Sequence, residues 1–598
     1  MVNRGASQGC ITCRQRHVKC DESKPQCKTC LRLGRECAGY GKKGLLVRFK
    51  DESGRFSGRP SHQRIRVSNR SLAKTTAATM TTKATTTPTQ LAPSASHNYA
   101  AMLSSPSLVQ QDLALSFFLT YVTGIGRNLE STRGFIEFVR PALAAEHHSS
   151  ALFAAVNAVA TLLWVLLGHS SPSILRPTHL LNKALLRLQK AIGDPEDRGR
   201  DATVLAALVL QAYETISAVL GQHRADGTHR DGALALLLHR GPDAGDSKYH
   251  GSLLGNILHA KVSLCVREKR PFPVHWIEWV QTKVIPQVPV NPSYLLDVIG
   301  ISVANLQHQF LRPLPLQEPV SYFELEEWSQ CVRTLDTRLW MWQQDVPHHW
   351  HPRRISSEKY IKSSNIRYQG ACDVYPTVQI ANIWNVWRIY RLLLIQIKLQ
   401  LAASMRKLAC DQKHAMQEDR NMDDIMDTTR HIRENQELLD SLCHSVPFYL
   451  GNRRVPAVFS DMENSELIFP SYHDLPSTDD AFLSYLESDC YVSRADHRRH
   501  VVLHGALHIM SILAYHIGLF AEARSLRLTE TFGHEQKNWI SEQFLRSAYL
   551  LRLIPEEPSL DTAHYDGAVE TQFGDMEVSK VEAMASTIRR RLWTISIL

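Results

Sequence analysis

The sequence predicts a mostly α-helical protein of three parts, and three observations support this prediction. Six of the twelve cysteines fall within residues 10–37, which indicates a small metal-stabilised module. Nine threonines fall within residues 75–89, which is typical of a low-complexity linker. Later residues repeat apolar side chains at three- and four-residue spacing, as amphipathic helices do. We therefore expect the module at 1–42, a disordered basic and threonine-rich linker at 43–109, and a large all-helical domain at 110–598.

The N-terminal cysteines form two copies of one pattern, Cys-x2-Cys-x6-Cys: Cys10, Cys13 and Cys20, then Cys27, Cys30 and Cys37. The chain shows no secretory signal, so a reducing compartment favours metal ligation over disulfides. Thiolates favour Zn²⁺, and two tetrahedral zinc ions need eight ligand positions. Either two cysteines bridge, or one zinc ion binds four cysteines and leaves two free. The repeat favours bridging by equivalent members over a single structural zinc or a redox Cys-x2-Cys pair.

The spacing C-x2-C-x6-C-x6-C-x2-C-x6-C, with the interior CRQRHVKCDESKPQC, resembles the fungal binuclear zinc cluster, Zn2Cys6, of transcription regulators. The resemblance implies two zinc ions. Pro25 matches the loop proline that separates the two halves in that family. The resemblance also implies bridging by Cys10 and Cys27, with the ligand sets Cys10, Cys13, Cys20, Cys27 and Cys10, Cys27, Cys30, Cys37.

The two six-residue inserts of the repeat differ in charge. The first, RQRHVK, carries four basic side chains and no acid, whereas the second, LRLGRE, carries two leucines, two arginines and a glutamate. The first insert therefore suits contact with phosphates and base edges, and the second has apolar residues to pack. A short helix after Cys13 fits the major groove, where arginine donates to guanine O6 and N7. The alternative is a solvated basic face. The candidate DNA-binding residues are Arg14, Arg16, His17 and Lys19.

The resemblance gives these four side chains different roles. It implies that Arg16 and His17 lie at the pair of positions near which such regulators contact a CGG triplet. It also implies that Arg14 and Lys19 contact phosphate or brace the helix. His17 departs from the commoner lysine, and its charge is lost as the pH rises through the imidazole pKa of about 6.5.

Charge is divided unevenly along the chain. Residues 1–100 hold 19 Lys+Arg against 5 Asp+Glu, a net of +14, whereas the remaining 49 Lys+Arg and 54 Asp+Glu give −5. A polyanion partner is therefore expected for the N-terminal part alone. Basic side chains continue from Lys42 to Arg70, which favours phosphate contacts, nuclear import or a solvated arm. No leucine heptad follows the cysteines, so a homodimer would form without an evident coiled coil.

One apolar stretch, residues 151–168, raises the question of a membrane span. It is 18 residues long, contains Asn157 and Thr161, and is flanked by histidines instead of Lys/Arg anchors. We therefore expect a buried core helix, no membrane association and, from the basic N-terminal part, a nuclear location.

The predicted helical domain shows no spacing typical of a catalytic site, so we do not expect an enzyme. G-x-S-x-G, H-E-x-x-H, G-x-G-x-x-G and P-loop spacings are absent. PHHWHP at 347–352 lacks helical spacing and an acidic partner, which favours a proline-bounded loop over a metal site. HRDGALALLLHRGP at 229–242 and HSVPFYLG at 444–451 resemble segments of the fungal-specific transcription factor regulatory domain that accompanies such clusters.

Two acidic stretches stand out in this domain. Residues 461–493 hold eight acids, five aromatic residues and no Lys/Arg, and residues 555–579 hold seven acids and no Lys/Arg. This composition is typical of activation segments that bind transcription coregulators as disordered peptides. Solvated loops between helices are an equally good interpretation.

The leading hypothesis is a nuclear, sequence-specific DNA-binding regulator of RNA polymerase II genes, in which the zinc cluster binds CGG-like sites in double-stranded DNA. The helical domain would supply regulation and dimerisation. The rival hypothesis is a zinc/thiol redox or metabolite sensor with a ligand-binding or enzymatic helical body. The absence of catalytic spacing argues against the enzymatic version.

Overall fold

The structure is a computed structural model, and it describes two stretches of the chain. The first is 10–37, with gaps at 11, 14–15, 17, 22, 24–25 and 36. The second is 106–591, with gaps at 125–130, 132–133, 170–174, 220–226, 241–248, 287–290, 312–320, 357–363, 413–426, 476–484, 486, 489–490, 526–531 and 555–574. Apart from residues 106–109, the predicted linker lies outside the described residues.

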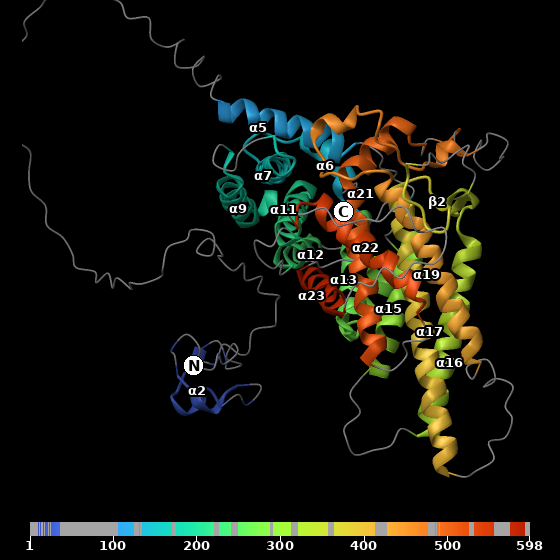
Figure 1. The fold of residues 1–598 in the computed structure, drawn as a ribbon. Helices are drawn as coiled ribbons and strands as arrows, with labels where there is room; N and C mark the ends of the chain where they lie inside the picture. Colours follow the sequence, from blue (N-terminus) through green and yellow to red (C-terminus); the bar gives the residue numbers. More distant parts are fainter. Residues whose placement is uncertain are drawn as a thin grey trace, which may run out of the picture. The chain divides into compact units, whose positions relative to one another are not determined.

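The chain divides into two compact units, Met1–Ser57 and Gly58–Leu598. Within the first unit, Thr12 and Cys13 are helical and α2 spans Lys28–Arg32 (Figure 1). The second unit is built almost entirely of helices, which confirms the prediction of a mostly α-helical protein. Among its described residues, the first helix along the chain is α5, which begins at Pro106.

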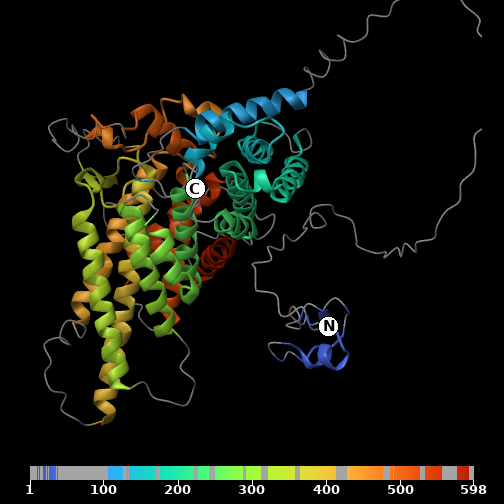
Figure 2. The same ribbon diagram turned by 180° about the vertical axis from the view of Figure 1, so that it is seen from behind.

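The first group of helices in the second unit surrounds the buried helix α11. This helix contacts α6, α7, α9 and α12, and its buried side chains run from Thr203 to Val219. Figures 1 and 2 show the group on one side of the unit. Its elements are α5 (Pro106–Phe117), η1 (Phe118–Val122), α6 (Ile136–Ala144), α7 (Ala151–Leu166), α9 (Pro177–Gly193), α10 (Pro195–Arg198), α11 (Asp201–Val219) and α12 (Thr228–Arg240).

The second group is centred on the 35-residue helix α17. This helix contacts α15, α16 and α19, and Figures 1 and 2 show α16, α17 and α19 running side by side. The elements of this group are α13 (His250–Glu268), α14 (Val274–Trp279), η3 (Val280–Val284), α15 (Pro292–Leu311), α16 (Tyr322–Asp345), η4 (His348–Trp350), β1 (Arg353–Ile355), β2 (Cys372–Val374), α17 (Val378–Gln412) and α19 (Thr428–Leu450).

The C-terminal elements connect the two groups. Helix α21 contacts α17 and α19 of the second group and η1 of the first, and α23 contacts α11. These elements are η5 (Phe459–Met462), η6 (Tyr472–Asp474), α21 (Arg494–Ser525), α22 (His534–Leu550) and α23 (Asp575–Arg591).

Side-chain caps define where several of these helices begin. At the start of α16, the Ser321 hydroxyl accepts from the Glu324 N–H at 3.2 Å, and the Glu324 carboxylate accepts from the Ser321 N–H at 2.9 Å. At the start of α19, Asp427 accepts from the Arg430 N–H at 3.0 Å. These oxygens satisfy N–H groups that have no partner inside the helix.

The apolar stretch at 151–168 forms helix α7, which is packed inside the fold. Ser150 caps its start, and the helix contacts α5, α9 and α11. By length and composition, two other helices are long and apolar enough to cross a membrane, Asp201–Val219 and Arg494–Ala523. In each of them 83% of the apolar window is buried, as in the core helices of a packed domain.

The domain also contains one short antiparallel β-hairpin, which the sequence analysis did not anticipate. Arg353 lies opposite Val374 and Ile355 opposite Cys372. Strands of three residues are too short to show a two-residue period. An ion pair between Arg354 and Asp373, with Nε and Oδ1 2.9 Å apart, lies across the hairpin.

Two segments singled out in the sequence take definite shapes. PHHWHP forms the 3₁₀ turn η4 between Pro347 and Pro352. The first acidic stretch is folded onto the core as far as residue 475: Met462 and Tyr472 are buried, and Asp461 pairs with Arg453 at 2.8 Å. Neither a disordered peptide nor a simple solvated loop describes this part. Residues 476–484 and 555–574 lie outside the described residues.

Candidate metal centre

The two halves of the cysteine repeat have matching backbone hydrogen bonds. The carbonyl of Cys13 accepts from the Val18 N–H at 3.1 Å, and the carbonyl of Cys30 accepts from the Arg35 N–H at 3.0 Å. Each of these bonds spans five residues and ends a short helical turn. The sequence repeat is therefore also a structural repeat, in which Cys10, Cys13 and Cys20 correspond to Cys27, Cys30 and Cys37.

The same correspondence holds for the sulfur atoms. In each half, one backbone N–H donates to the sulfur of the first cysteine: Cys13 N to Cys10 Sγ at 3.4 Å, and Cys30 N to Cys27 Sγ at 3.2 Å. In each half, another backbone N–H donates to the sulfur of the third cysteine: Cys10 N to Cys20 Sγ at 3.3 Å, and Cys27 N to Cys37 Sγ at 3.4 Å. Such bonds stabilise negative charge on metal-bound thiolates and fix their orientation.

The six sulfurs form two groups of four that share two members. Within each group the ligand atoms lie within 4.8 Å of one another: Cys10, Cys13, Cys20, Cys27 and Cys10, Cys27, Cys30, Cys37. Cys10 and Cys27 belong to both, and their Sγ atoms are 3.6 Å apart. Cys10 Sγ is 3.8 Å from Cys30 Sγ, and Cys27 Sγ is 3.7 Å from Cys13 Sγ. A tetrahedral Zn²⁺ with Zn–S bonds of about 2.3 Å has sulfurs about 3.8 Å apart, so these spacings fit zinc.

Cysteine side chains form the buried centre of this unit. Among its described residues, the buried hydrophobic cluster consists of Cys10, Cys13, Cys27, Cys30 and Cys37, with Cys20 packed against it. Without a metal, burial raises the pKa of the Cys13 thiol to about 12 and raises the pKa of Cys10 and Cys27 as well. A metal ion must displace these protons, so binding zinc releases protons and supplies the folding energy that an apolar core would otherwise provide.

Residues 8–44 match the fungal Zn(2)-Cys(6) binuclear cluster domain. A binuclear cluster of this kind holds two zinc ions, and the donor set of six thiols in two overlapping groups of four suits two tetrahedral ions. The match leaves the helical domain outside its range.

Similar curated proteins are named as fungal regulators. The chain is 54% identical over 39 residues to the transcriptional regulatory protein moc3 of Schizosaccharomyces pombe, covering 6% of this chain and 8% of that protein. It is 62% identical over 32 residues to the aspercryptin biosynthesis cluster-specific transcription regulator atnN of Emericella nidulans, covering 5% of each. It is 48% identical over 40 residues to White-opaque regulator 2 of Candida albicans, covering 7% of this chain and 9% of that protein. The similarity thus spans less than a tenth of these relatives. No solved structure matches the chain.

The structure places two of the four predicted DNA-binding residues. Arg16 and Lys19 are both exposed, while Arg14, His17 and the loop residue Pro25 lie outside the described residues. At the positions equivalent to Arg14 and Arg16, the second half carries Leu31 and Leu33, which are 56% and 49% exposed. The expectation that the second insert packs its apolar residues is therefore not met within this unit. The two halves share one backbone but present different surfaces.

Asp21 contributes to this unit in a way that the cysteine spacing did not predict. Its carboxylate accepts from the backbone N–H groups of Lys28 and Thr29, each at 3.1 Å, and from the Thr29 hydroxyl at 3.2 Å. It therefore ties the end of the first half to the start of α2 in the second. Hydrogen bonds from the Ser23 hydroxyl, and then from these backbone groups, hold the pKa of Asp21 well below its usual range. The sequence feature that could have indicated this role is an acidic residue directly after the third cysteine and several residues before a short helix.

PHHWHP forms a turn that packs against the core. Among the described residues, the groups with metal-binding geometry consist of cysteines alone. Trp350 is fully buried, and the ring of His349 stacks on Tyr485 with centroids 5.1 Å apart. The turn therefore anchors the loop after α16 to the core.

Proposed function

We propose that this protein is a sequence-specific DNA-binding transcription regulator whose Zn2Cys6 module recognises CGG-like sites. The observation that carries the proposal is the pair of overlapping four-sulfur groups sharing Cys10 and Cys27, within a segment that matches the binuclear cluster domain. In this proposal Cys10, Cys13, Cys20 and Cys27 hold one zinc ion. Cys10, Cys27, Cys30 and Cys37 hold the other.

The DNA contacts are assigned to the first half of the repeat. Arg16 is exposed directly after the helical turn at Cys13, and Lys19 is exposed before Cys20. The zinc ligands stiffen the turn that carries Arg16, so its guanidinium suits bidentate donation to a guanine edge. The exposed ammonium of Lys19 suits contact with a phosphate. Arg14 and His17 complete the proposed surface. At the positions equivalent to Arg14 and Arg16, the second half presents leucines, which offer no donor for DNA, although Arg32 and Arg35 beside them are exposed.

The remaining features of the proposal concern the whole chain. We assign it to the nucleus, to genes transcribed by RNA polymerase II, and to regulation without enzymatic activity. The names of similar proteins support the regulatory role. The helical unit would act as the fungal-specific regulatory domain, contact transcription coregulators and allow a homodimer without a coiled coil.

Zinc-dependent DNA binding tests this proposal. Binding of the full-length, zinc-loaded protein to a duplex carrying two CGG triplets would be measured by fluorescence anisotropy, beside a scrambled duplex of equal composition. We expect binding at least about tenfold tighter to the CGG duplex, which is lost after zinc chelation and restored by added zinc. Cys20→Ala is expected to abolish binding.

The chain offers a matched control for the cysteine substitution. Cys331 lies exposed on α16, away from the repeat in sequence, so Cys331→Ala is expected to bind DNA as the wild type does. Sequence-selective binding that survives complete metal removal would overturn the proposal. Equal binding to the two duplexes would overturn its CGG specificity.

A further inference from the structure

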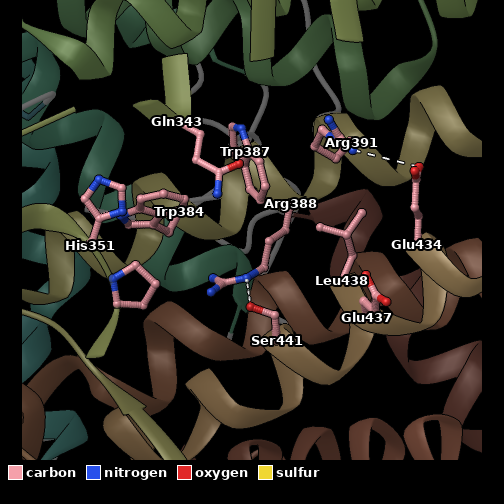
Figure 3. Close-up of a pocket in the computed structure, with 11 residues that line it drawn as sticks. Gln343, His351, Trp384, Trp387, Arg388, Arg391, Glu434, Glu437, Leu438 and Ser441 are labelled. Atoms are coloured by element: carbon pink, nitrogen blue, oxygen red, sulfur yellow. Dashed lines mark hydrogen bonds and ion pairs between the residues drawn. The ribbon is translucent and has the colours of Figure 1, made fainter. Parts of the chain in front are cut away.

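The helical unit contains a partly open pocket of about 320 Å³ between α17 and α19, with the end of α16 and the turn after η4 closing one side (Figure 3). Its volume lies at the lower end of the range typical of small-molecule sites. The pocket combines indole rings, a buried guanidinium and a charged rim. These three features together indicate what it binds.

Arg388 is the buried cation of the pocket. Its side chain is 1% exposed, and it donates to three neutral groups: Nε to the Ser441 hydroxyl at 3.0 Å, Nη1 to Asn385 Oδ1 at 2.8 Å, and Nη2 to the Tyr375 hydroxyl at 2.9 Å. Within the described residues it forms no ion pair. Because a guanidinium has five N–H donors, these bonds leave one N–H on each terminal nitrogen.

A second buried arginine has a different set of acceptors. Arg546 donates to the carbonyl oxygens of Gly451 and Arg453 at 2.8 and 2.6 Å, and to Gln543 at 3.0 Å. It does not line the pocket. Arg546 therefore binds backbone and acts structurally, whereas Arg388 presents remaining donor capacity to a cavity.

The walls of the pocket are apolar faces. The indole N–H of Trp384 donates to the Trp350 carbonyl at 2.7 Å, and that of Trp387 donates to the Leu339 carbonyl at 3.0 Å. Their polar atoms are thus occupied, and what the two largely buried rings present to the pocket is hydrocarbon. Figure 3 shows both rings beside Arg388, with Leu438 on the facing helix.

The rim carries charges of both signs, and its arginine already has acidic partners. Arg391 pairs with Asp336 at 3.0 Å and lies 4.0 Å from Glu434, which also accepts from Arg430 at 2.9 Å. Glu437 is exposed at the opening. Arg388 is therefore the arginine of the pocket that lacks a carboxylate partner among the described residues.

We propose that this pocket binds a small organic acid with a flat apolar body, its carboxylate on Arg388 and its body against Trp384 and Trp387. A planar carboxylate matches the fork of a guanidinium, and desolvation inside the pocket strengthens the pair. Burying an arginine without a counter-charge is costly, and a bound carboxylate offsets that cost. This site is independent of the proposed DNA recognition, because it lies in the other unit.

The test uses matched acids and amides on the full-length protein. Isothermal titration calorimetry would compare indole-3-acetate and benzoate with indole-3-acetamide and benzamide, at ligand concentrations up to about 10 mM. At least one acid is expected to bind, at least about tenfold more tightly than its amide, because the amide cannot form a charge-assisted pair. No binding by either acid, or equal binding of an acid and its amide, would overturn the proposal.

Two variants locate the site. Arg388→Met keeps much of the side-chain volume without the charge and is expected to lose acid binding, whereas Glu437→Gln at the exposed rim is expected to retain it. If circular dichroism shows that Arg388→Met is unfolded, Ser441→Val serves in its place, because a branched apolar side chain beside the guanidinium obstructs the carboxylate. Acid binding that persists in the folded pocket variant would show that the acid binds elsewhere and would contradict the proposal.

Discussion

The Sγ atoms of Cys10 and Cys27 lie 3.6 Å apart, and both atoms belong to each of the two four-sulfur groups. The two residues are also equivalent members of the structural repeat, since each accepts an N–H from the second cysteine of its own half. This relationship explains how six sulfurs can fill eight coordination positions. In the proposed arrangement of two zinc ions, it also distinguishes two bridging ligands from four terminal ones.

Zinc stoichiometry should distinguish the two kinds of ligand. Native mass spectrometry of the full-length protein under mild chelator competition is expected to show two zinc ions in the wild type. Cys10→Ala removes a ligand from both ions, so both are expected to be lost. Cys20→Ala removes a ligand from one ion, and one zinc is expected to be retained. Identical zinc content in the two variants would argue against bridging by Cys10.

Arg16 and Lys19 are expected to contribute to DNA binding in different ways. Arg16→Ala should cost about 1–3 kcal/mol of discrimination between the CGG duplex and a single-base variant, because it removes a base-edge contact. Lys19→Ala should weaken binding to all sequences about equally and lower the salt slope by about one. Quantitative titrations at several salt concentrations measure both effects.

Arg32 supplies the control for these substitutions. It is exposed in the last turn of α2, in the half that presents leucines. Arg32→Ala is therefore expected to leave base discrimination unchanged. If Arg16→Ala weakened binding equally on every sequence, Arg16 would be a phosphate contact.

Asp21 is expected to stabilise the zinc module through the start of α2. Asp21→Ala leaves the N–H groups of Lys28 and Thr29 without their carboxylate acceptor, so the variant should lose zinc faster to a competing chelator. Asp21→Asn keeps an acceptor oxygen and should fall between the wild type and Asp21→Ala. The rate of zinc transfer to a chromogenic chelator measures this order. A rate in Asp21→Ala equal to that of the wild type would show that the cap contributes nothing.

The candidate metal ligands could be predicted from the sequence, whereas the hydrogen bonds and packing around them could not. Ligand spacing is local, so the pattern from Cys10 to Cys37 was sufficient to identify six candidate ligands. The hydrogen bonds from α2 to Asp21 depend on how the loop between the two halves folds, and the spacing of the cysteines does not determine that fold. The exposure of Leu31 and Leu33 was missed for a related reason, because an apolar residue in a small module need not find a partner within it.

The same contrast holds in the helical unit. Three- and four-residue spacing was enough to predict helices such as α9 and α17, because side chains at this spacing fall on a face that the fold buries. The pocket was not predictable, because Arg388 on α17 meets Ser441 on α19 only after the chain has folded across 53 residues. The hairpin of Arg353–Ile355 with Cys372–Val374 is too short to leave a periodic signal.

Buried histidines on α21 should make the helical unit sensitive to acid. Burial lowers the pKa of His497 to about 3 and that of His516 to about 4. Their unfolded pKa is about 6.5, so below that pH the unfolded state binds more protons than the folded state. The free energy of unfolding should therefore fall as the pH drops from about 6.5, by up to about 1.4 kcal/mol per pH unit for each histidine.

Urea denaturation followed by circular dichroism at pH 7.5 and 5.5 tests this sensitivity. His497→Leu should lose less stability than the wild type between the two pH values, because it removes one of the titrating groups. His147 is exposed, so His147→Gln should behave as the wild type does. A pH dependence that His497→Leu leaves unchanged would show that His497 binds protons equally in the folded and unfolded states, so that folding does not lower its pKa.

The most direct test of the central claim is a selection from random duplexes with the full-length, zinc-loaded protein at near-physiological salt. Zinc-dependent, sequence-specific recognition predicts enrichment of CGG-like triplets, as two copies at fixed spacing for a dimer or one copy for a monomer. Enrichment of no sequence, with DNA retained only at low salt, would contradict it.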